Sequence, residues 1–385
     1  MTKDSRTGGQ ADDQPDEDER LDPRIVNGWQ ALESGDIDTA KQAAASVLAQ
    51  GEATDPEAGG GGAAEASRLD ALLLAAACAR EENDAESALE HLALAAEEDP
   101  EWCTPELWTA ELLSEDPERL DEALRHARRA LDHAEEEDEY LDALRCKAAI
   151  ELDLGRPTEA RKTLSGLPPA DVPLDDPSAT LDFAQLLMDA GDPAEARERL
   201  TALTEAHPRL ADGWYLLGAV AELLNDEEAK RAAWLTTRAL DLEAMDRPGG
   251  AGDGEAPARL AAPDLSLTED ALIAVAEEAL AEMPPELRAQ MKNVPIVVAE
   301  MPAAADVAAG LDPRLLGLFS GSPHAQSAAI LGPPELTEII LFRANIERFA
   351  VDEEALRDEV RTTLLHEAGH FFGLDEAALA RLGLA

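Results

Sequence analysis

Five residues near the end of the chain, His366-Glu367-Ala368-Gly369-His370, form an HExxH motif, and their types and spacing suit zinc chemistry. Two histidines four positions apart on a helix lie one turn above each other, so both imidazoles can reach one metal ion. The glutamate between them can take a proton from the attacking water as a general base. The motif therefore predicts zinc at His366 and His370, with Glu367 as the base for peptide-bond hydrolysis.

A third protein ligand is expected, because a catalytic zinc is ordinarily held by three. Downstream of the motif the available carboxylates are Asp375 and Glu376. Glu376 lies three residues after Gly373, the position of the third ligand in HExxHxxGxx(H/D) enzymes, so it is the favoured candidate. Asp375 is the second candidate, although it also suits the N-cap of a last short helix. An upstream ligand, or no third protein ligand, are the remaining alternatives.

The residues around the motif have the two faces that a helix beside a cleft requires. At about 100° per residue, His370 lies about 40° and Glu367 about 100° from His366 around the helix axis. The apolar residues fall on the other side, at Val360, Leu364, Leu365, Ala368, Phe371 and Phe372. Gly373 suits the left-handed residue that ends a helix. The sequence predicts a helix that packs on one side, carries the metal ligands on the other and ends at Gly373.

The elements that must position this helix form a small α+β domain, expected at residues 264–385. Helical spacing runs from Leu267 to Met291, with Thr268 as N-cap and an interruption at Pro284-Pro285. Short apolar or β-branched runs predict three strands, at 294–299, 315–319 and 338–343. Helix, small sheet and motif helix together indicate the α+β class.

The region before this domain, residues 23–246, repeats itself. Apolar residues three and four apart predict amphipathic helices throughout it. An alanine expected in the second helix of each pair recurs at Ala40, Ala88, Ala123, Ala160, Ala196 and near Ala229. After a longer first step, these intervals are close to the period of about 34 residues of the tetratricopeptide repeat. The unit from Phe183 through Gly191-Asp192-Pro193 to Pro208 also resembles that repeat.

Small residues are expected where the two helices of a pair cross, because larger side chains would hold the backbones apart. They recur at Gly28, Ala76, Ala148, Ala184 and Gly218, and turn glycines recur at Gly35, Gly155 and Gly191. We therefore expect an all-α solenoid of tetratricopeptide-like repeats. Such a surface suits an extended peptide or a partner's helix, so a protein partner is expected there. The alternative is a purely structural or self-associating array.

Composition limits the class of protein. The 385 residues, 45% of them apolar, provide for two hydrophobic cores. Residues 1–22 have the composition of a disordered acidic tail, and residues 247–263, rich in Gly, Pro and Ala, that of a flexible linker. The net charge of −50, from 82 acidic and 32 basic residues, argues against binding to nucleic acid or anionic membranes.

The expected location is the cytoplasm. No apolar run reaches the roughly 18 residues of a spanning helix, and the start lacks the apolar core of a secretory signal. The three cysteines, Cys78, Cys103 and Cys146, are odd in number and far apart. They are therefore expected to be buried, reduced thiols.

The C-terminal region resembles the minimal zincin-like metallopeptidases, a small bacterial family. The resemblance rests on the segments Thr362–Glu376, Asp312–Gly321 and Ile339–Arg343 and covers about residues 268–385. It implies a compact zincin-like fold, zinc at His366 and His370, and Glu367 as base. Glu376 stands where the family more usually has Asp.

Two functions are compatible with these features. The first is a zinc-dependent metallopeptidase that hydrolyses peptide or protein substrates and whose repeats recruit a substrate or a regulator. The alternative is a protein-interaction adaptor whose C-terminal domain is a structural or catalytically inactive zinc module.

Overall fold

The computed structural model of the chain describes residues 22–51, 61–245, 268–283, 285–291, 294–320, 338–350, 352–372, 374–375, 378 and 381. The chain divides into two compact units, one of residues 1–168 with 189–191, the other of residues 169–188 with 192–385. The expected linker at 247–263 lies outside the described residues, as does the expected tail at 1–22 apart from Asp22.

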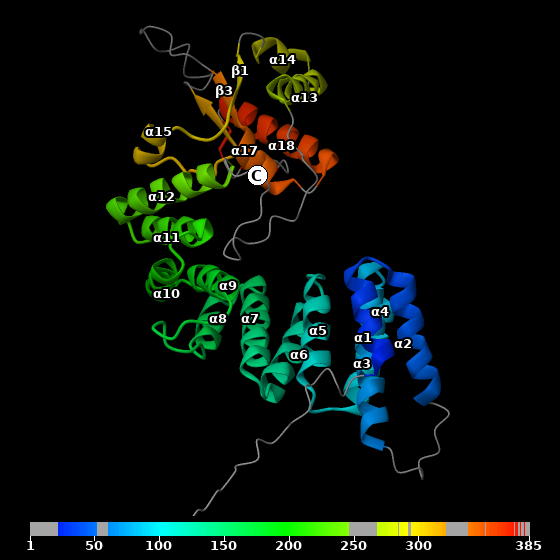
Figure 1. Cartoon of the computed structure of the whole chain (residues 1–385). Coiled ribbons are helices and arrows are strands. Elements are labelled where there is room, and N and C mark those ends of the chain that lie inside the picture. The colour runs from blue at the N-terminus through cyan, green and yellow to red at the C-terminus, as the bar shows by residue number, and fades with distance from the viewer. Residues whose placement is uncertain are drawn as a thin grey trace, which may run out of the picture. The chain divides into compact units, whose positions relative to one another are not determined.

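The first unit is built, in its described part, from helices packed in consecutive pairs (Figure 1). A short turn joins most partners of a pair, as the repeat pattern predicts. The helices are α1 (Pro23–Glu33), α2 (Ile37–Gly51), α3 (Gly61–Glu81), α4 (Ala85–Glu98), α5 (Cys103–Ser114), α6 (Leu120–His133), α7 (Glu137–Asp153) and α8 (Pro157–Leu164).

The second unit contains further helix pairs and a small sheet. Its helices are α9 (Pro177–Asp189), α10 (Pro193–Ala206), α11 (Ala211–Leu223), α12 (Glu227–Met245), α13 (Glu269–Glu282), α14 (Pro285–Met291), α15 (Ala304–Ala308), α17 (Arg343–Phe349) and α18 (Glu353–Phe371). Its strands are β1 (Ile296–Ala299), β2 (Gly317–Ser320) and β3 (Glu338–Phe342). The predicted fold class, tetratricopeptide-like helical repeats followed by a small α+β domain, is confirmed.

The recurring alanines of the repeats are buried where the helices cross. Five of them have no exposed surface: Ala40, Ala88, Ala123, Ala160 and Ala196. In each case the backbone N–H donates to the carbonyl of the residue just before the helix, four positions earlier. In α12 the residue with this hydrogen bond is Lys230, which donates to Asp226. The equivalent position is therefore next to Ala229, as predicted, but a lysine takes it in place of an alanine.

Lys230 is accommodated there because its charge is paired. Its ammonium contacts Glu222 at 3.3 Å and Glu227 at 3.0 Å, and it lies 5.4 Å from the centre of the Trp234 ring. Trp234 in turn fills the space left by Gly218, where a Cβ would collide with the indole. Glycine is thus required at this crossing, as predicted.

The turns within the helix pairs need one residue in the left-handed region. Gly35, Gly155 and Gly191 have φ angles of 80°, 68° and 79°, which glycine adopts without strain. Asn83 and Asn225, both at φ 58°, take this place in two further turns. Asparagine tolerates this conformation better than other residues with a side chain, so the turn geometry persists where glycine is missing.

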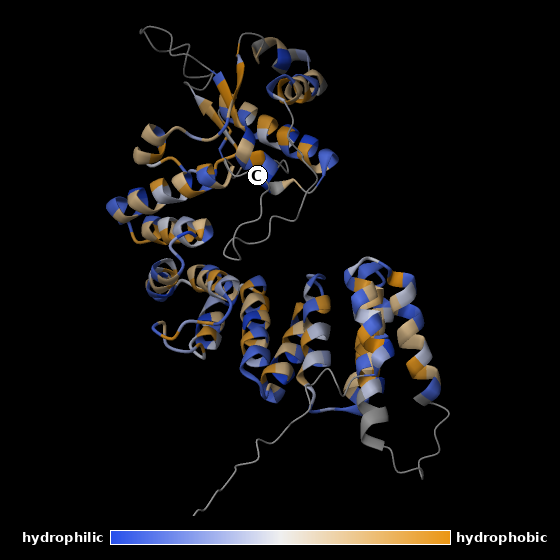
Figure 2. Ribbon diagram, in the orientation of Figure 1, coloured by the Kyte–Doolittle hydropathy of each residue, from blue (hydrophilic) through white to orange (hydrophobic). Residues whose placement is uncertain are grey.

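The sheet of the C-terminal domain has the strand order β1-β3-β2. β1 pairs with β3 in parallel, with Ile296 opposite Ile339, and β2 pairs with β3 antiparallel, with Leu318 opposite Ile340. All three predicted strands are present, and among the described strands β2 lies at one edge of the sheet. Figure 2 shows hydrophobic residues concentrated on these strands, while the helices carry both kinds of residue.

The core of this domain lies between the sheet and helices α13 and α18. It contains buried residues from all of them, including Leu272, Ile339, Leu341, Val360 and Leu364. The hydroxyl of Thr268 accepts a hydrogen bond from the backbone N–H of Ala271, so the predicted N-cap of α13 is confirmed. The motif helix α18 is therefore packed against both α13 and the sheet.

The cysteines are free and buried, as predicted. Burial raises the pKa of Cys103 to about 11 and that of Cys146 to about 12. Both are therefore thiols at neutral pH and poor nucleophiles. In the described ranges, no helix is both long enough and apolar enough to cross a membrane.

Candidate metal centre

Helix α18 presents the HExxH residues from its last two turns. Asp352 begins the helix by accepting a hydrogen bond from the backbone N–H of Ala355 at 2.8 Å. Of the predicted packing residues, Val360, Leu364, Ala368 and Phe371 are buried, whereas Leu365 and Phe372 are half-buried. His366 and His370 lie off this face and are half-buried. The two histidines are thus less buried than the packing residues, as predicted, but Glu367, which was predicted to lie with them on the opposite edge, is buried.

The two imidazoles converge on one point. The Nε2 atoms of His366 and His370 lie 3.1 Å apart, close to the roughly 3.3 Å between two nitrogens bound to one tetrahedral zinc. The Nδ1 of His370 lies 3.2 Å from the carbonyl oxygen of Leu374. Because a carbonyl only accepts, this Nδ1 carries the proton and the Nε2 lone pair is free to bind a metal. The two imidazoles are therefore placed as two ligands of one zinc ion would be.

Glu367 lies beside the histidines but on the sheet side of the helix. Its side chain is largely buried, with 6% of the residue exposed, and its Oε2 accepts a hydrogen bond from the backbone N–H of Phe319 at 2.6 Å. Burial raises the pKa of Glu367, although the hydrogen bond from Phe319 and the nearby histidines oppose this. A carboxylate with a raised pKa is better suited to hold a proton during a reaction.

β2 approaches α18 closely because residue 317 is glycine. A Cβ at Gly317 would lie 2.6 Å from Cγ2 of Thr363 and 3.0 Å from Cγ of Glu367. The sequence interpretation treated Gly317 only as part of an apolar run and missed this role. The available signal was a glycine inside a strand, which often marks close backbone approach.

The third ligand stays a prediction. Glu376 and Gly373 lie outside the described residues. Asp375 is exposed, and its Oδ1 accepts a hydrogen bond from the backbone N–H of Ala378 at 2.9 Å, the capping role that the sequence allowed. Within the described part of the chain, no group of three or more His, Cys, Asp or Glu side chains is arranged to hold a metal.

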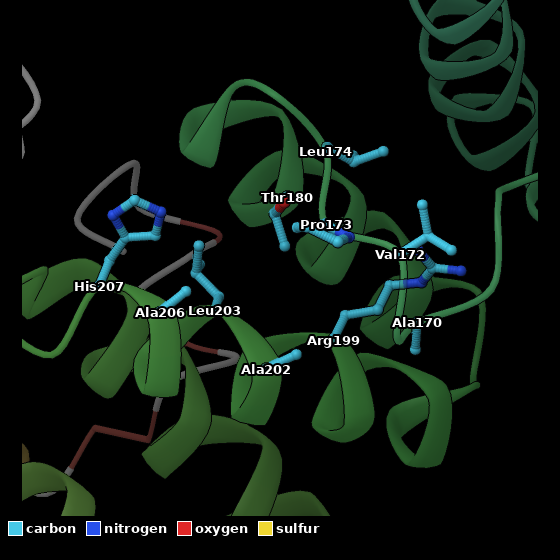
Figure 3. Close-up of a pocket in the computed structure, with 10 residues that line it drawn as sticks. All are labelled: Ala170, Val172, Pro173, Leu174, Thr180, Arg199, Ala202, Leu203, Ala206 and His207. Carbon is cyan, nitrogen blue, oxygen red and sulfur yellow. The ribbon is translucent and has the colours of Figure 1, made fainter.

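Two cavities lie elsewhere in this unit, and His366, Glu367 and His370 line neither. The first, between the loop 170–174 and helices α9 and α10, is lined by Arg199 and His207 among others (Figure 3). Its volume of about 30 Å³ suffices for little more than water. The second, of about 240 Å³, lies between α13, α14 and β1. The candidate centre is thus separate from both of these cavities.

The C-terminal part of the chain is similar to a known family. Residues 291–384 match the model of the family described as zincin-like metallopeptidase. No curated protein matches the chain at a significant level.

The solved structures that this chain matches include tetratricopeptide repeat proteins. A pilF protein of Pseudomonas aeruginosa is 19% identical, with 59% of this chain and 95% of that chain covered and a TM-score of 0.43. A tetratricopeptide repeat protein of Parabacteroides merdae is 14% identical, with 70% and 95% covered and a TM-score of 0.40. The C-terminal part of a repeat protein of Cytophaga hutchinsonii is 12% identical, with 75% and 95% covered and a TM-score of 0.43.

Proposed function

Because the chain carries a zincin-like metallopeptidase domain behind tetratricopeptide-like repeats, we propose that it is a zinc-dependent peptidase. The main support for this proposal is the distance of 3.1 Å between the Nε2 atoms of His366 and His370. The buried carboxylate of Glu367 belongs to the residue that directly follows His366. Together they supply two metal ligands and a base. Glu376 is the proposed third ligand, with Asp375 as the less favoured choice.

Zinc in this site would polarise the scissile carbonyl and make water a nucleophile near neutral pH. Glu367 accepts a proton from that water as its oxygen attacks the carbonyl carbon. The same carboxyl group then gives the proton to the leaving nitrogen as the C–N bond breaks. Burial raises the pKa of Glu367 because it disfavours the charged carboxylate. This supports the proposed role, since the carboxyl group must hold the proton between the two steps.

The edge strand β2 supports alignment of a peptide substrate beside Glu367. The carbonyl of Leu316 accepts from the N–H of Phe342 on β3. Because hydrogen-bonding direction alternates along an antiparallel strand, Leu318 also faces β3, whereas Gly317 and Phe319 face away. An extended peptide can add to such an edge. The helical repeats would then recruit the protein substrate or a regulator.

One observation favours the alternative of an adaptor with a structural or inactive zinc module. Glu367 is 6% exposed and already holds a hydrogen bond, so it resembles a group used for packing. In that case zinc stabilises the fold and the repeats provide the function.

Metal removal distinguishes the two. The metal content and thermal unfolding of the full chain should be measured before and after chelation, beside cleavage of an unfolded, reduced and alkylated protein. A peptidase loses cleavage with little loss of stability, because its fold has a hydrophobic core of its own. A large loss of stability, with no cleavage before chelation, overturns the peptidase in favour of the zinc module. His366→Ala should abolish both zinc and cleavage.

A further inference from the structure

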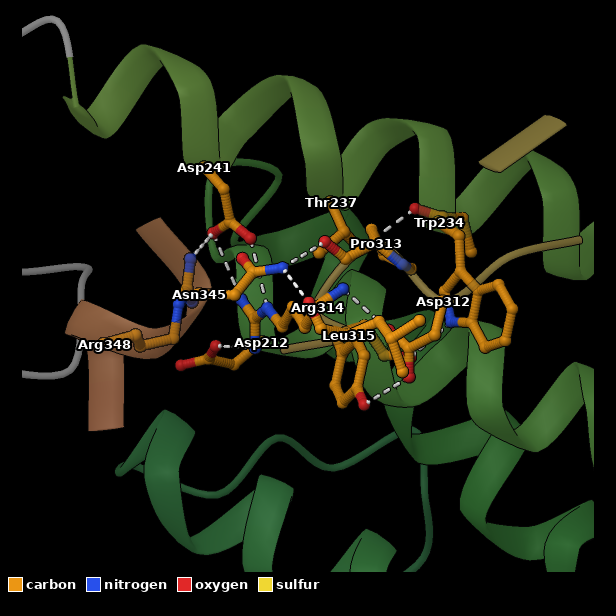
Figure 4. Close-up of polar contacts among 12 residues, drawn as sticks. Asp212, Trp234, Thr237, Asp241, Asp312, Pro313, Arg314, Leu315, Asn345 and Arg348 are labelled. Atoms are coloured by element: carbon orange, nitrogen blue, oxygen red, sulfur yellow. Dashed lines mark hydrogen bonds and ion pairs between the residues drawn. The ribbon is translucent and has the colours of Figure 1, made fainter. Parts of the chain in front are cut away.

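Arg314, in the loop between α15 and β2, is held by two helices of the last repeat pair (Figure 4). Its Nη1 lies 2.6 Å from Asp212 of α11, and its Nε lies 3.1 Å from Asp241 of α12. Its Nη2 donates a second hydrogen bond to Asp241 at 3.2 Å. The guanidinium also stacks 4.7 Å from the centre of the Tyr215 ring. Arg314 is 10% exposed and Asp241 4%, so water cannot replace these contacts.

Hydrogen bonds from Asn345 and to Asp312 hold the backbone around Arg314. Asn345 of α17 is fully buried, and its Nδ2 donates to the carbonyls of Pro313 at 2.9 Å and Leu315 at 2.8 Å. The carboxylate of Asp312 accepts from the backbone N–H of Arg314 at 2.7 Å and from the hydroxyl of Tyr215 at 3.0 Å. The loop therefore has one conformation that depends on side chains of both the repeats and the C-terminal domain.

This loop leads directly into the strand that contacts Glu367. Gly317 begins β2 three residues after Arg314, and the N–H of Phe319 donates to Glu367. Only two residues separate Arg314 from the first residue of β2. The position of Arg314 therefore limits where β2, and with it the hydrogen bond to Glu367, can lie. Packing of this kind transmits a displacement of the loop to the strand.

We propose that Arg314 is a positioning residue for the candidate base Glu367, and that α11 and α12 of the repeats form part of the support of the peptidase site. The proposal rests on the proposed function and deepens it. Asp212 and Asp241 hold Arg314, Arg314 sets the position of β2, and β2 orients Glu367. Movement of this last repeat pair changes catalysis even though its residues lie outside the metal centre.

The test compares Arg314→Ala and Asp241→Asn with the wild-type chain. Asp241→Asn keeps the volume of the side chain and removes its charge. The matched control is Arg209→Ala. Arg209 forms an exposed ion pair, at 3.0 Å, with Glu243, which lies on α12 like Asp241. Removing this pair does not change the contacts of the loop that contains Arg314. Arg314→Lys keeps the charge but cannot reach two carboxylates in the same planar geometry. Its kcat and its exchange at Phe319 should therefore lie between those of the wild type and those of Arg314→Ala.

Three readouts are required: hydrogen exchange of the Phe319 amide, zinc content, and kcat and KM for cleavage of the unfolded protein. In Arg314→Ala and Asp241→Asn, exchange at Phe319 should accelerate, and kcat should fall by about tenfold, the lower end of the range seen when partners behind the ligands of a metal site are lost. KM and zinc content should stay close to the wild-type values, because none of the changed residues belongs to the metal centre. Arg209→Ala should match the wild type in all three readouts.

Unchanged exchange and unchanged kcat in both variants overturn the proposal. If Arg314→Ala does not fold, Asp241→Asn and Arg314→Lys decide by the same readouts. A wild-type chain that binds zinc but cleaves nothing overturns the proposed function alone. The exchange of the Phe319 amide then still shows whether Arg314 positions β2 against Glu367.

Discussion

The backbone N–H of Phe319 donates a hydrogen bond to Oε2 of Glu367 over 2.6 Å. This contact joins β2 to the glutamate of the HExxH motif. The carboxylate of Glu367 is therefore oriented by the sheet, and the strand that suits a peptide substrate is the same strand that holds the candidate base.

Replacing Phe319 by proline removes this N–H. Proline is tolerated on an edge strand where the N–H does not bond to the next strand, and the N–H of Phe319 faces away from β3. We expect zinc content to persist and kcat to fall by about tenfold, as for other contacts behind a metal site. Phe319→Leu retains the N–H and serves as control. Equal kcat values for the two variants would mean that this hydrogen bond does not orient Glu367.

Gly317→Ala should disturb the contact between β2 and α18. The added Cβ would lie 2.6 Å from Cγ2 of Thr363 and 3.0 Å from Cγ of Glu367. We expect a loss of about 1–3 kcal/mol in the free energy of unfolding, the usual cost of overpacking, measured by urea denaturation. Adding Thr363→Ala relieves the closer contact and should recover part of the loss. A double variant no more stable than Gly317→Ala contradicts this explanation.

Asp241→Asn should destabilise the second unit. Asp241 is 4% exposed and contacts both Arg314 and Arg348, the latter at 2.7 Å. Removing one charge from a buried network leaves its partners uncompensated, which typically costs about 3–5 kcal/mol. Because Asp212 still pairs with Arg314, the lower end is expected in thermal or urea unfolding.

Glu243→Gln, an exposed change on the same helix, is the control for Asp241→Asn and should cost at most about 0.5 kcal/mol. Similar losses for the two variants would contradict a special role of Asp241.

The contacts of Asp312 with Arg314 and Tyr215 should also affect how the free energy of unfolding depends on pH. Burial raises the pKa of Asp312 above its ordinary value of 3.8, although hydrogen bonds from Arg314 and Tyr215 oppose this. The folded chain thus holds this proton more tightly than the unfolded chain, so the contribution of Asp312 to stability decreases as pH rises through its ordinary value towards its folded pKa.

Asp312→Asn does not titrate, and it can still accept from the backbone N–H of Arg314. The free energy of unfolding of the wild type minus that of the variant should therefore decrease as the pH rises above the ordinary pKa of 3.8. A difference that increases as the pH rises would refute the stated sign.

The helices, the strands and the histidine geometry were predictable because they depend on local patterns. Apolar spacing and small residues determine the helix pairs, and the i, i+4 spacing places His366 above His370. The use of Lys230 in place of an alanine was not predictable from the alanine period, because its charge is paired by Glu222 and Glu227 only in the folded chain.

The contacts of Glu367 and Arg314 were also missed for a physical reason. Phe319 is 48 residues from Glu367 along the chain, and Asp241 is 73 residues from Arg314. A single sequence carries no pattern that pairs such distant residues. Their contacts follow from how β2 packs on α18 and how the last repeat pair packs on the loop.

The central claim is that Glu367 is the base of a zinc-dependent peptidase, and Glu367→Gln tests it most directly. The amide keeps the size of the side chain and an oxygen to accept from Phe319, but it cannot take the proton. Cleavage of an unfolded protein should be compared for wild type, Glu367→Gln and the control Glu354→Gln, an exposed first-turn residue of α18. The account predicts equal zinc in all three and a loss of roughly 10²–10⁴-fold in kcat for Glu367→Gln alone. Equal, chelator-insensitive rates for wild type and Glu367→Gln would contradict it.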